Sequence, residues 1–175
     1  MDYNIYLTGF SGTGKTTTGK ALARILRVTF IDMDYEIENI QGKTIPQIFN
    51  MCGEEGFRQI ETKLLKEISS ETGQIVSTGG GVPTFDENRR IMLNAGKIIC
   101  LTAKPEILLQ RLKGHEEAVG EKAARPMLLS DCPLARIRRL LSERENSYSK
   151  SDLVVNTEIL EPEAVAKKII ERLSL

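Results

Sequence analysis

The 175-residue sequence has no excess of charge of either sign and little sulfur or imidazole chemistry. Lys and Arg together number 24, as do Asp and Glu, so no overall field attracts nucleic acid or an anionic membrane. Any anion recognition must then come from local clusters. The single histidine and the three scattered cysteines have neither zinc-type spacing nor a disulfide framework. The cysteines are interpreted as reduced thiols of a cytoplasmic protein.

Long apolar segments are also missing. No run approaches the ~18 apolar residues of a membrane span, and Asp2 stands where a signal peptide carries basic residues. The sequence has no internal repeat and no linker, so we expect one domain over residues 1–175. We further expect a soluble cytoplasmic protein without nucleic-acid or membrane partners, and a monomer by default.

Apolar runs and helical periods alternate along the whole chain. Strands are expected at 3–8, 28–32, 74–78, 97–102 and 153–156. Helices are expected at 15–27, at 35–72 with interruptions near Gly42 and Gly53, and at 86–95, 105–112, 133–150 and 162–173. Strands separated by helices predict an α/β fold whose mainly parallel sheet is covered on both faces.

The segment Gly9–Thr16 has the P-loop pattern Gly-x4-Gly-Lys-Thr, between the first strand and the first helix. Its glycines let backbone N–H groups approach a phosphate at the positive end of a helix. Lys15 is predicted to bridge the β- and γ-phosphates of ATP, and Thr16 to offer its hydroxyl to Mg²⁺. The predicted nucleotide-binding residues of this region are Gly12, Thr13, Gly14, Lys15, Thr16 and Thr17.

Two aspartates and three glycines follow the next two strands. Asp32 ends the second strand and Asp34 lies just beyond it, while residues 79–81 follow the third strand, so all should face the crevice of the P-loop. The third strand carries no acid, so Asp32 is the predicted magnesium carboxylate, acting through water. Asp34 would orient or deprotonate an acceptor hydroxyl, or else cap the helix that starts at Tyr35. The glycines form either a plain turn or a surface for close approach of a ligand.

Two arginines are informative because of the helix face that they occupy. Arg144 falls on the apolar stripe of the helix at 133–150, and an inward guanidinium requires an anion such as a substrate carboxylate or phosphate. Arg58 either pairs with Glu61 three residues on, or is held by it to clamp a substrate carboxylate. The other arginines of the later helix, Arg136, Arg138 and Arg139, are interpreted as solvated.

Residues 113–125 lose helical periodicity and become charged. They form either a disordered loop or a lid that excludes water from the reacting phosphates. In a lid, Arg125 would neutralise charge on the transferred group. Arg111 would stack on adenine, or place a favourable charge at the end of its helix.

Taken together, these residues resemble the shikimate kinases, a family in the nucleoside-monophosphate-kinase branch of P-loop proteins. The resemblance rests on Gly-x4-Gly-Lys-Thr, Asp32-x-Asp34, Phe57-Arg58-x-x-Glu61, Ser77-Thr78-Gly79-Gly80-Gly81, Arg125-Pro126 and Arg144-x-x-x-Tyr148. It implies a three-layer α/β/α sandwich with strand order 2-3-1-4-5 and a mobile lid. It also implies transfer of the γ-phosphoryl group of Mg-ATP to the 3-hydroxyl of shikimate.

The resemblance also assigns roles to residues. The catalytic residues would be Lys15, Asp34 and Arg125. Shikimate would lie against a helical region at about 33–61 and contact Asp34, Arg58, Gly79, Gly80, Gly81 and Arg144, with the two arginines on its carboxylate. Arg111 and Arg125 would contact ATP, and Asn156-Thr157 would begin the loop on the other side of adenine.

Two other functions fit parts of this pattern. One is a related kinase for gluconate or a nucleoside monophosphate, although Asp34 with two arginines suits a hydroxylated carboxylic acid better. The other is a regulatory nucleotide-binding module without transferase activity, which would not need acceptor residues.

Overall fold

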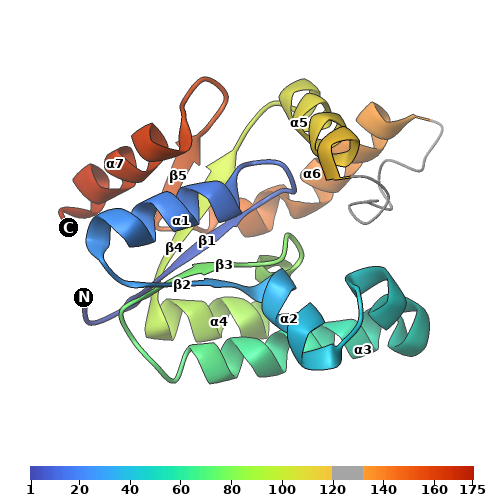
Figure 1. The fold of residues 1–175 in the computed structure, drawn as a ribbon, viewed down its shortest axis with the longest axis horizontal. Coiled ribbons are helices and arrows are strands. Elements are labelled where there is room, and N and C mark those ends of the chain that lie inside the picture. Colours follow the sequence, from blue (N-terminus) through green and yellow to red (C-terminus); the bar gives the residue numbers. More distant parts are fainter. Residues whose placement is uncertain (120–131) are drawn as a thin grey trace.

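A single five-stranded parallel sheet forms the centre of the molecule (Figure 1). The structure, a computed structural model, describes residues 1–119 and 132–175. The strands are β1 (Asn4–Gly9), β2 (Thr29–Asp32), β3 (Gln74–Ser77), β4 (Gly96–Thr102) and β5 (Leu153–Asn156). Every neighbouring pair is parallel and the order is β2-β3-β1-β4-β5, which confirms the predicted α/β fold and strand order.

Helices cover both faces of the sheet, because apolar side chains of the central strands point alternately to each side. Ile5 and Leu7 of β1 belong to a core shared with α1 (Lys15–Leu26) and α7 (Pro162–Leu173). Tyr6 between them belongs to a core with α3 (Ile45–Ile68) and α4 (Asp86–Ala95) on the opposite face. A third cluster joins β4 to α5 (Pro105–Val119) and α6 (Pro133–Ser149).

The segments that follow β2 and β3 lie at the carboxyl end of the sheet. β2 runs directly into α2 (Met33–Gln41), two residues earlier than expected, and the short 3₁₀ helix η1 (Val82–Thr84) after β3 was not predicted. Gly42 ends α2 with φ 60° and Gly53 kinks α3 with φ 69°, at the two interruptions that the sequence predicted.

Helix α5 is longer than the sequence indicated. It continues to Val119, so the expected end at Leu112 was wrong. Residues 113–119 lack an apolar stripe, but apart from Gly114 most of them are tolerated in an exposed helix and none is proline. Residues 113–119 of the expected lid are therefore helical, whereas residues 120–125 lie outside the described residues. Within the described ranges, no helix has the length and apolar character required to cross a membrane.

Candidate active site

The P-loop lies between β1 and α1, as predicted. Gly12 and Gly14 have φ of 85° and 89°, which residues with a side chain rarely adopt, and this permits the tight path of the loop. α1 begins at Lys15, so the loop meets the positive N-terminal end of a helix. The Lys15 ammonium donates hydrogen bonds to the carbonyls of Gly9 at 2.9 Å and Phe10 at 3.0 Å. The loop thus has the geometry and charge that bind phosphate.

Asp32 links the P-loop helix to α2. Its Oδ2 accepts a hydrogen bond of 2.6 Å from the Thr16 hydroxyl, and its Oδ1 accepts from the N–H groups of Asp34 and Tyr35. Asp32 is therefore the N-cap of α2. The alternative role of Asp34 as the cap was wrong, because β2 leads straight into the helix and Asp34 already lies in its first turn.

The pair formed by Thr16 and Asp32 suits Mg²⁺, which prefers hard oxygen ligands and retains several waters. Both oxygens of Asp32 already have protein donors, which favours contact with an ion through water. Among residues 1–119 and 132–175, no three His, Cys, Asp or Glu side chains form a metal-binding group. An ion here would therefore depend on nucleotide phosphates and water for its other ligands.

The three glycines after β3 are approached closely by the predicted acceptor residues. A methyl group on Gly79 would lie 2.7 Å from Glu61 Oε1 and 2.9 Å from Asp34 Oδ1. One on Gly81 would lie 2.5 Å from Arg58 Nη1. These glycines are thus more than a plain turn, since any side chain there would displace a carboxylate or a guanidinium.

Arg58 is held on several sides. Its guanidinium donates to Glu61 at 2.5 Å and to Glu54 at 3.2 Å, and its Cζ lies 5.6 Å from the ring centroids of both Phe57 and Phe85. Burial disfavours its charge, but the two carboxylates outweigh this and raise the pKa of Arg58. Its Nε is the one buried side-chain nitrogen or oxygen without a hydrogen-bond partner among the described residues. The predicted ion pair between Arg58 and Glu61 is therefore formed, and the Nε of Arg58 remains a donor without a partner.

Glu61 is the buried carboxylate of the site, with 1% of its surface exposed. Burial raises the pKa of Glu61 to about 7, and the nearby charge of Asp34 adds to this effect, while Arg58 and Arg144 oppose it. Glu61 thus interacts electrostatically with both arginines and the aspartate that were predicted to bind one acceptor.

Arg144 points inward from α6, as its place on the apolar stripe predicted. Its Cζ lies 5.6 Å from the ring centroid of Phe10, and a methyl group on Gly80 would lie 3.3 Å from its Nη1. One turn further, the Tyr148 hydroxyl donates to the Gly80 carbonyl at 2.9 Å, and burial raises the pKa of Tyr148. The other arginines of α6 are exposed, which confirms their interpretation as solvated: Arg136, Arg138 (paired with Glu106) and Arg139 (paired with Glu143).

A cavity of about 390 Å³ lies on the other side of the P-loop. It is lined by Gly12, Thr13, Gly14, Thr17, Thr18, Arg111, Val165 and residues 157–162. The Arg111 guanidinium donates to the Gly12 carbonyl at 3.3 Å and to the Thr157 carbonyl at 2.6 Å. Arg111 therefore joins the P-loop to the segment after β5. Its alternative role at a helix end was wrong, because α5 continues for two more turns.

Asn156 does not line this cavity. Its side chain bonds to Glu158, and it is residues 157–162 that face the cavity. Of the residues in this segment that face the cavity, Thr157 was expected from the family resemblance, whereas residues 158–162 were not predicted, because a short segment after an edge strand has no periodic pattern. Arg125 lies outside the described residues.

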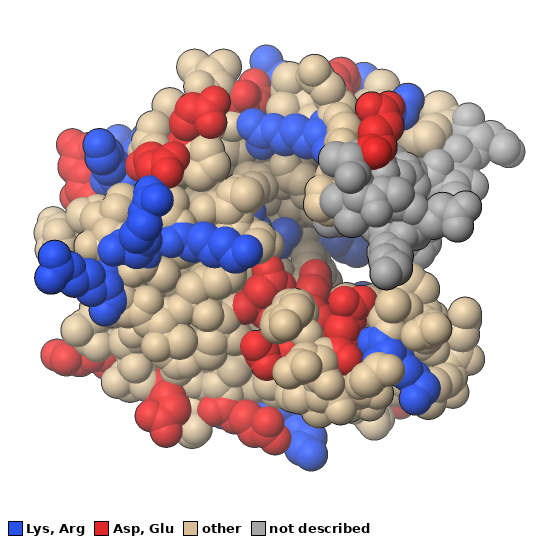
Figure 2. Space-filling model, viewed as in Figure 1, with Lys and Arg blue, Asp and Glu red and all other residues tan. Residues whose placement is uncertain are grey.

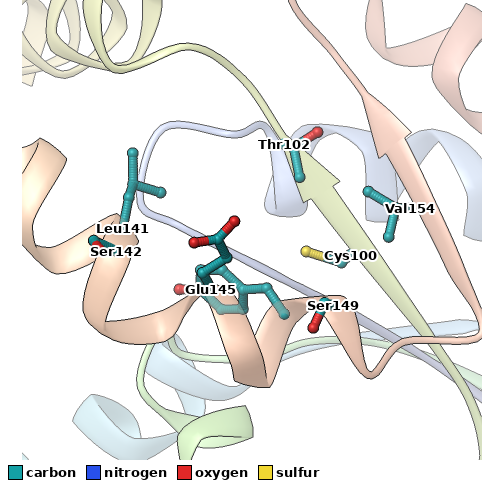
Figure 3. A pocket seen from close by; sticks show the side chains of 8 residues that line it. Cys100, Thr102, Leu141, Ser142, Glu145, Ser149 and Val154 are labelled. Carbon is teal, nitrogen blue, oxygen red and sulfur yellow. The ribbon is translucent and has the colours of Figure 1, made fainter.

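A second cavity, of about 480 Å³, lies between α6 and strands β4 and β5 (Figure 3). It is lined by Cys100, Thr102, Leu141, Ser142, Glu145, Tyr148, Ser149 and Val154. Burial raises the pKa of the Cys100 thiol to about 11, so this thiol is a poor nucleophile near neutral pH. No sequence pattern indicated this cavity.

The surface near the site is uneven in charge. In Figure 2, the view of Figure 1, the face is hollowed near its centre, and acidic side chains gather over α2 and α3 below the hollow. Basic side chains are visible inside it. This arrangement places cations in the depth of the hollow, where an anionic ligand would bind.

Comparisons with known proteins agree with this geometry. The family model described as shikimate kinase matches residues 11–174. A shikimate kinase of Thermodesulfovibrio yellowstonii is 42% identical over 174 residues, covering 98% of this chain and 96% of the relative. One of Caldicellulosiruptor bescii is 42% identical over 167 residues, covering 95% and 93%. The solved shikimate kinase of Acinetobacter baumannii, in complex with shikimate, has a TM-score of 0.89 and 36% identity, covering 98% and 93%.

Proposed function

Because the chain belongs to the shikimate kinase family, we propose that it transfers the γ-phosphoryl group of ATP to the 3-hydroxyl of shikimate. The products are shikimate 3-phosphate and ADP, in the route to aromatic amino acids. The observation that carries this proposal is the approach of Asp34, Arg58 and Arg144 to residues 79–81, beside the P-loop. Two cations and a carboxylate suit a small acid that also carries hydroxyl groups.

We assign the acceptor carboxylate to Arg58 and Arg144. The guanidinium of Arg58 has a buried Nε without a protein partner and is held in place by Glu61, so little side-chain entropy is lost when it binds an anion. Gly79, Gly80 and Gly81 let the ligand approach the backbone. Asp34, on the first turn of α2, orients or deprotonates the hydroxyl that attacks. Since phosphoryl transfer passes through a loose transition state, the orienting role is sufficient.

We assign the phosphates of ATP to the P-loop, with Lys15 donating to the β- and γ-phosphates and Gly12, Thr13, Gly14, Thr16 and Thr17 around them. Arg111 and the segment that begins at Asn156 flank the adenine. Arg125 would neutralise charge on the transferred group from a lid. Thr16 and Asp32 would hold Mg²⁺, which when bound screens the charges of the phosphates.

The test is ADP release with Mg-ATP and each of three acceptors: shikimate, gluconate and a nucleoside monophosphate. Of the three acceptors, we expect only shikimate to support turnover by the wild type. The Lys15→Met variant should not turn over shikimate. Turnover with gluconate and not shikimate would overturn the acceptor assignment. Tight ATP binding with no turnover on any acceptor would instead favour a regulatory nucleotide-binding module.

The remaining expectations are a monomeric state and a cytoplasmic location. Light scattering during gel filtration measures the first, with a mass near 19.5 kDa as the expected result. Cell fractionation tests the second.

A further inference from the structure

Phe10 contacts both halves of the site. It is the second residue of the P-loop and 1% of its surface is exposed. Its carbonyl accepts hydrogen bonds from the Lys15 ammonium at 3.0 Å and from the Thr13 hydroxyl at 2.8 Å. Its ring lies beneath the guanidinium of Arg144, with 5.6 Å between Cζ and the ring centroid. One residue therefore touches a lysine assigned to ATP and an arginine assigned to the acceptor.

The ring of Phe10 is fixed by its surroundings. It packs in the third apolar cluster with Ile137 and Tyr148 of α6 and Leu108 of α5. Tyr148 in turn donates to the Gly80 carbonyl, next to the guanidinium of Arg144. Close-packed side chains transmit displacement rather than absorb it. A shift of the loop at Phe10 therefore moves the ring against Arg144.

We propose that Phe10 is a positioning residue that couples nucleotide binding to the binding of the acceptor carboxylate. The proposal rests on the proposed function, since it takes Lys15 as a phosphate ligand and Arg144 as a carboxylate ligand. When Lys15 turns to the phosphates, the Phe10 carbonyl loses one of its donors and keeps Thr13. The peptide then relaxes toward Thr13, and the ring settles Arg144 in the orientation that receives the carboxylate.

This coupling has a thermodynamic signature. Nucleotide bound to the P-loop raises the affinity for shikimate, and bound shikimate raises the affinity for the nucleotide by the same factor. The aromatic face is the part of Phe10 that matters, because its quadrupole attracts the guanidinium whereas an aliphatic side chain only fills space. Replacing the ring should therefore remove the coupling and leave the P-loop backbone in place.

The test is calorimetric titration of shikimate with and without saturating ADP, for the wild type, Phe10→Leu and Phe10→Met. In the wild type, we expect ADP to lower the shikimate Kd. In both variants we expect the shikimate Kd with ADP to rise about five- to tenfold, the size of a cation–π contact. The effect of ADP should also nearly vanish, whereas the Kd of ADP alone should change less than about twofold.

Ile137→Val is the matched control, because it trims the same buried cluster but keeps both the aromatic ring of Phe10 and the guanidinium of Arg144. Equal loss of coupling in Ile137→Val would show that Phe10 acts only through packing and would overturn the proposal. So would a wild type without coupling, or two folded Phe10 variants that keep it. A wild type that does not turn over shikimate at all would instead refute the proposed function.

Discussion

Among single residues, Arg58, which we assign to the acceptor carboxylate, shows how a half-buried cation is held by its neighbours. Glu61 and Glu54 bind its two Nη atoms, and two phenylalanine rings lie against its faces. The sequence could predict that Arg58 and Glu61 meet, since three residues separate them on one helix. It could not predict the contact of Arg58 with Phe85, because Phe85 follows η1 and comes close to Arg58 only in the folded chain. No sequence pattern could indicate that the Nε of Arg58 lacks a hydrogen-bond partner.

Arg58→Ala should raise the KM for shikimate by about 30- to 100-fold, because a charge-assisted hydrogen bond to a ligand contributes roughly 2 to 3 kcal/mol. The KM for ATP should change less than about twofold, since the guanidinium of Arg58 bonds to Glu61 and Glu54 and not to the P-loop. Steady-state kinetics with each substrate varied in turn measures both. Arg138→Ala is the control and should leave both values unchanged, because Arg138 pairs only at the surface. An equal loss for ATP would disprove the carboxylate assignment.

At the level of elements, the site is built from chain that directly follows strands. Periodicity predicted most boundaries to within a residue or two, and the two glycines themselves indicated the end of α2 at Gly42 and the kink of α3 at Gly53.

Three boundaries were wrong for physical reasons. α3 ends at Ile68 rather than at residue 72, because the serines that follow it favour caps and turns over helix. α2 begins at Met33 because Asp32 both ends β2 and caps the helix. α5 continues to Val119, past the end of its apolar stripe, because helix propensity can extend a helix that has no apolar face there.

The segment after β3 offers a direct test of close approach. Gly81→Ala would bring a methyl group to 2.5 Å from Arg58 Nη1, so the guanidinium must move. We expect the shikimate KM to rise about tenfold, as for a displaced hydrogen-bonded ligand group, with ATP affinity preserved. Gly114→Ala is the matched control. Among residues 1–119 and 132–175, no atom beyond its own helix backbone lies within 4 Å of the added methyl. The variant should leave kinetics unchanged while stabilising α5 by up to about 1 kcal/mol. If Gly81→Ala bound shikimate normally, the packing of Arg58 on this glycine would be irrelevant to binding.

In the whole molecule, the site exists because the parallel sheet brings the carboxyl ends of β1, β2 and β3 to one edge, where α3 and α6 add their arginines. Spacing predicted that Asp32, Asp34 and residues 79–81 face this edge, whereas it left the role of Arg58 open. The strand order came from the family resemblance, because local patterns do not encode which strands are neighbours. Burial could be predicted only coarsely, and Glu61 illustrates this, since a glutamate on a helix is exposed in most proteins.

The burial of Glu61 makes the stability of the whole chain depend on pH. Its pKa is about 7 in the fold against 4.5 for an exposed glutamate, so between these values the folded state binds the proton more tightly. The free energy of unfolding should therefore fall as pH rises, by on the order of 2 to 3 kcal/mol between pH 5 and 8 from this group. Urea unfolding followed by circular dichroism at several pH values, wild type against Glu61→Gln, isolates the effect. The stability difference between the two should shift in favour of the glutamine variant as pH rises.

Glu54→Gln is the control for this measurement, because Glu54 binds the same arginine from an exposed position and should leave the slope unchanged. A difference between wild type and Glu61→Gln that is constant from pH 5 to 8 would mean that Glu61 stays charged throughout. In that case the attraction of Arg58 and Arg144 would exceed the cost of burial, and the pKa of Glu61 would lie below the range tested. The presence or absence of this pH dependence thus decides whether burial or ion pairing controls the carboxylate of Glu61.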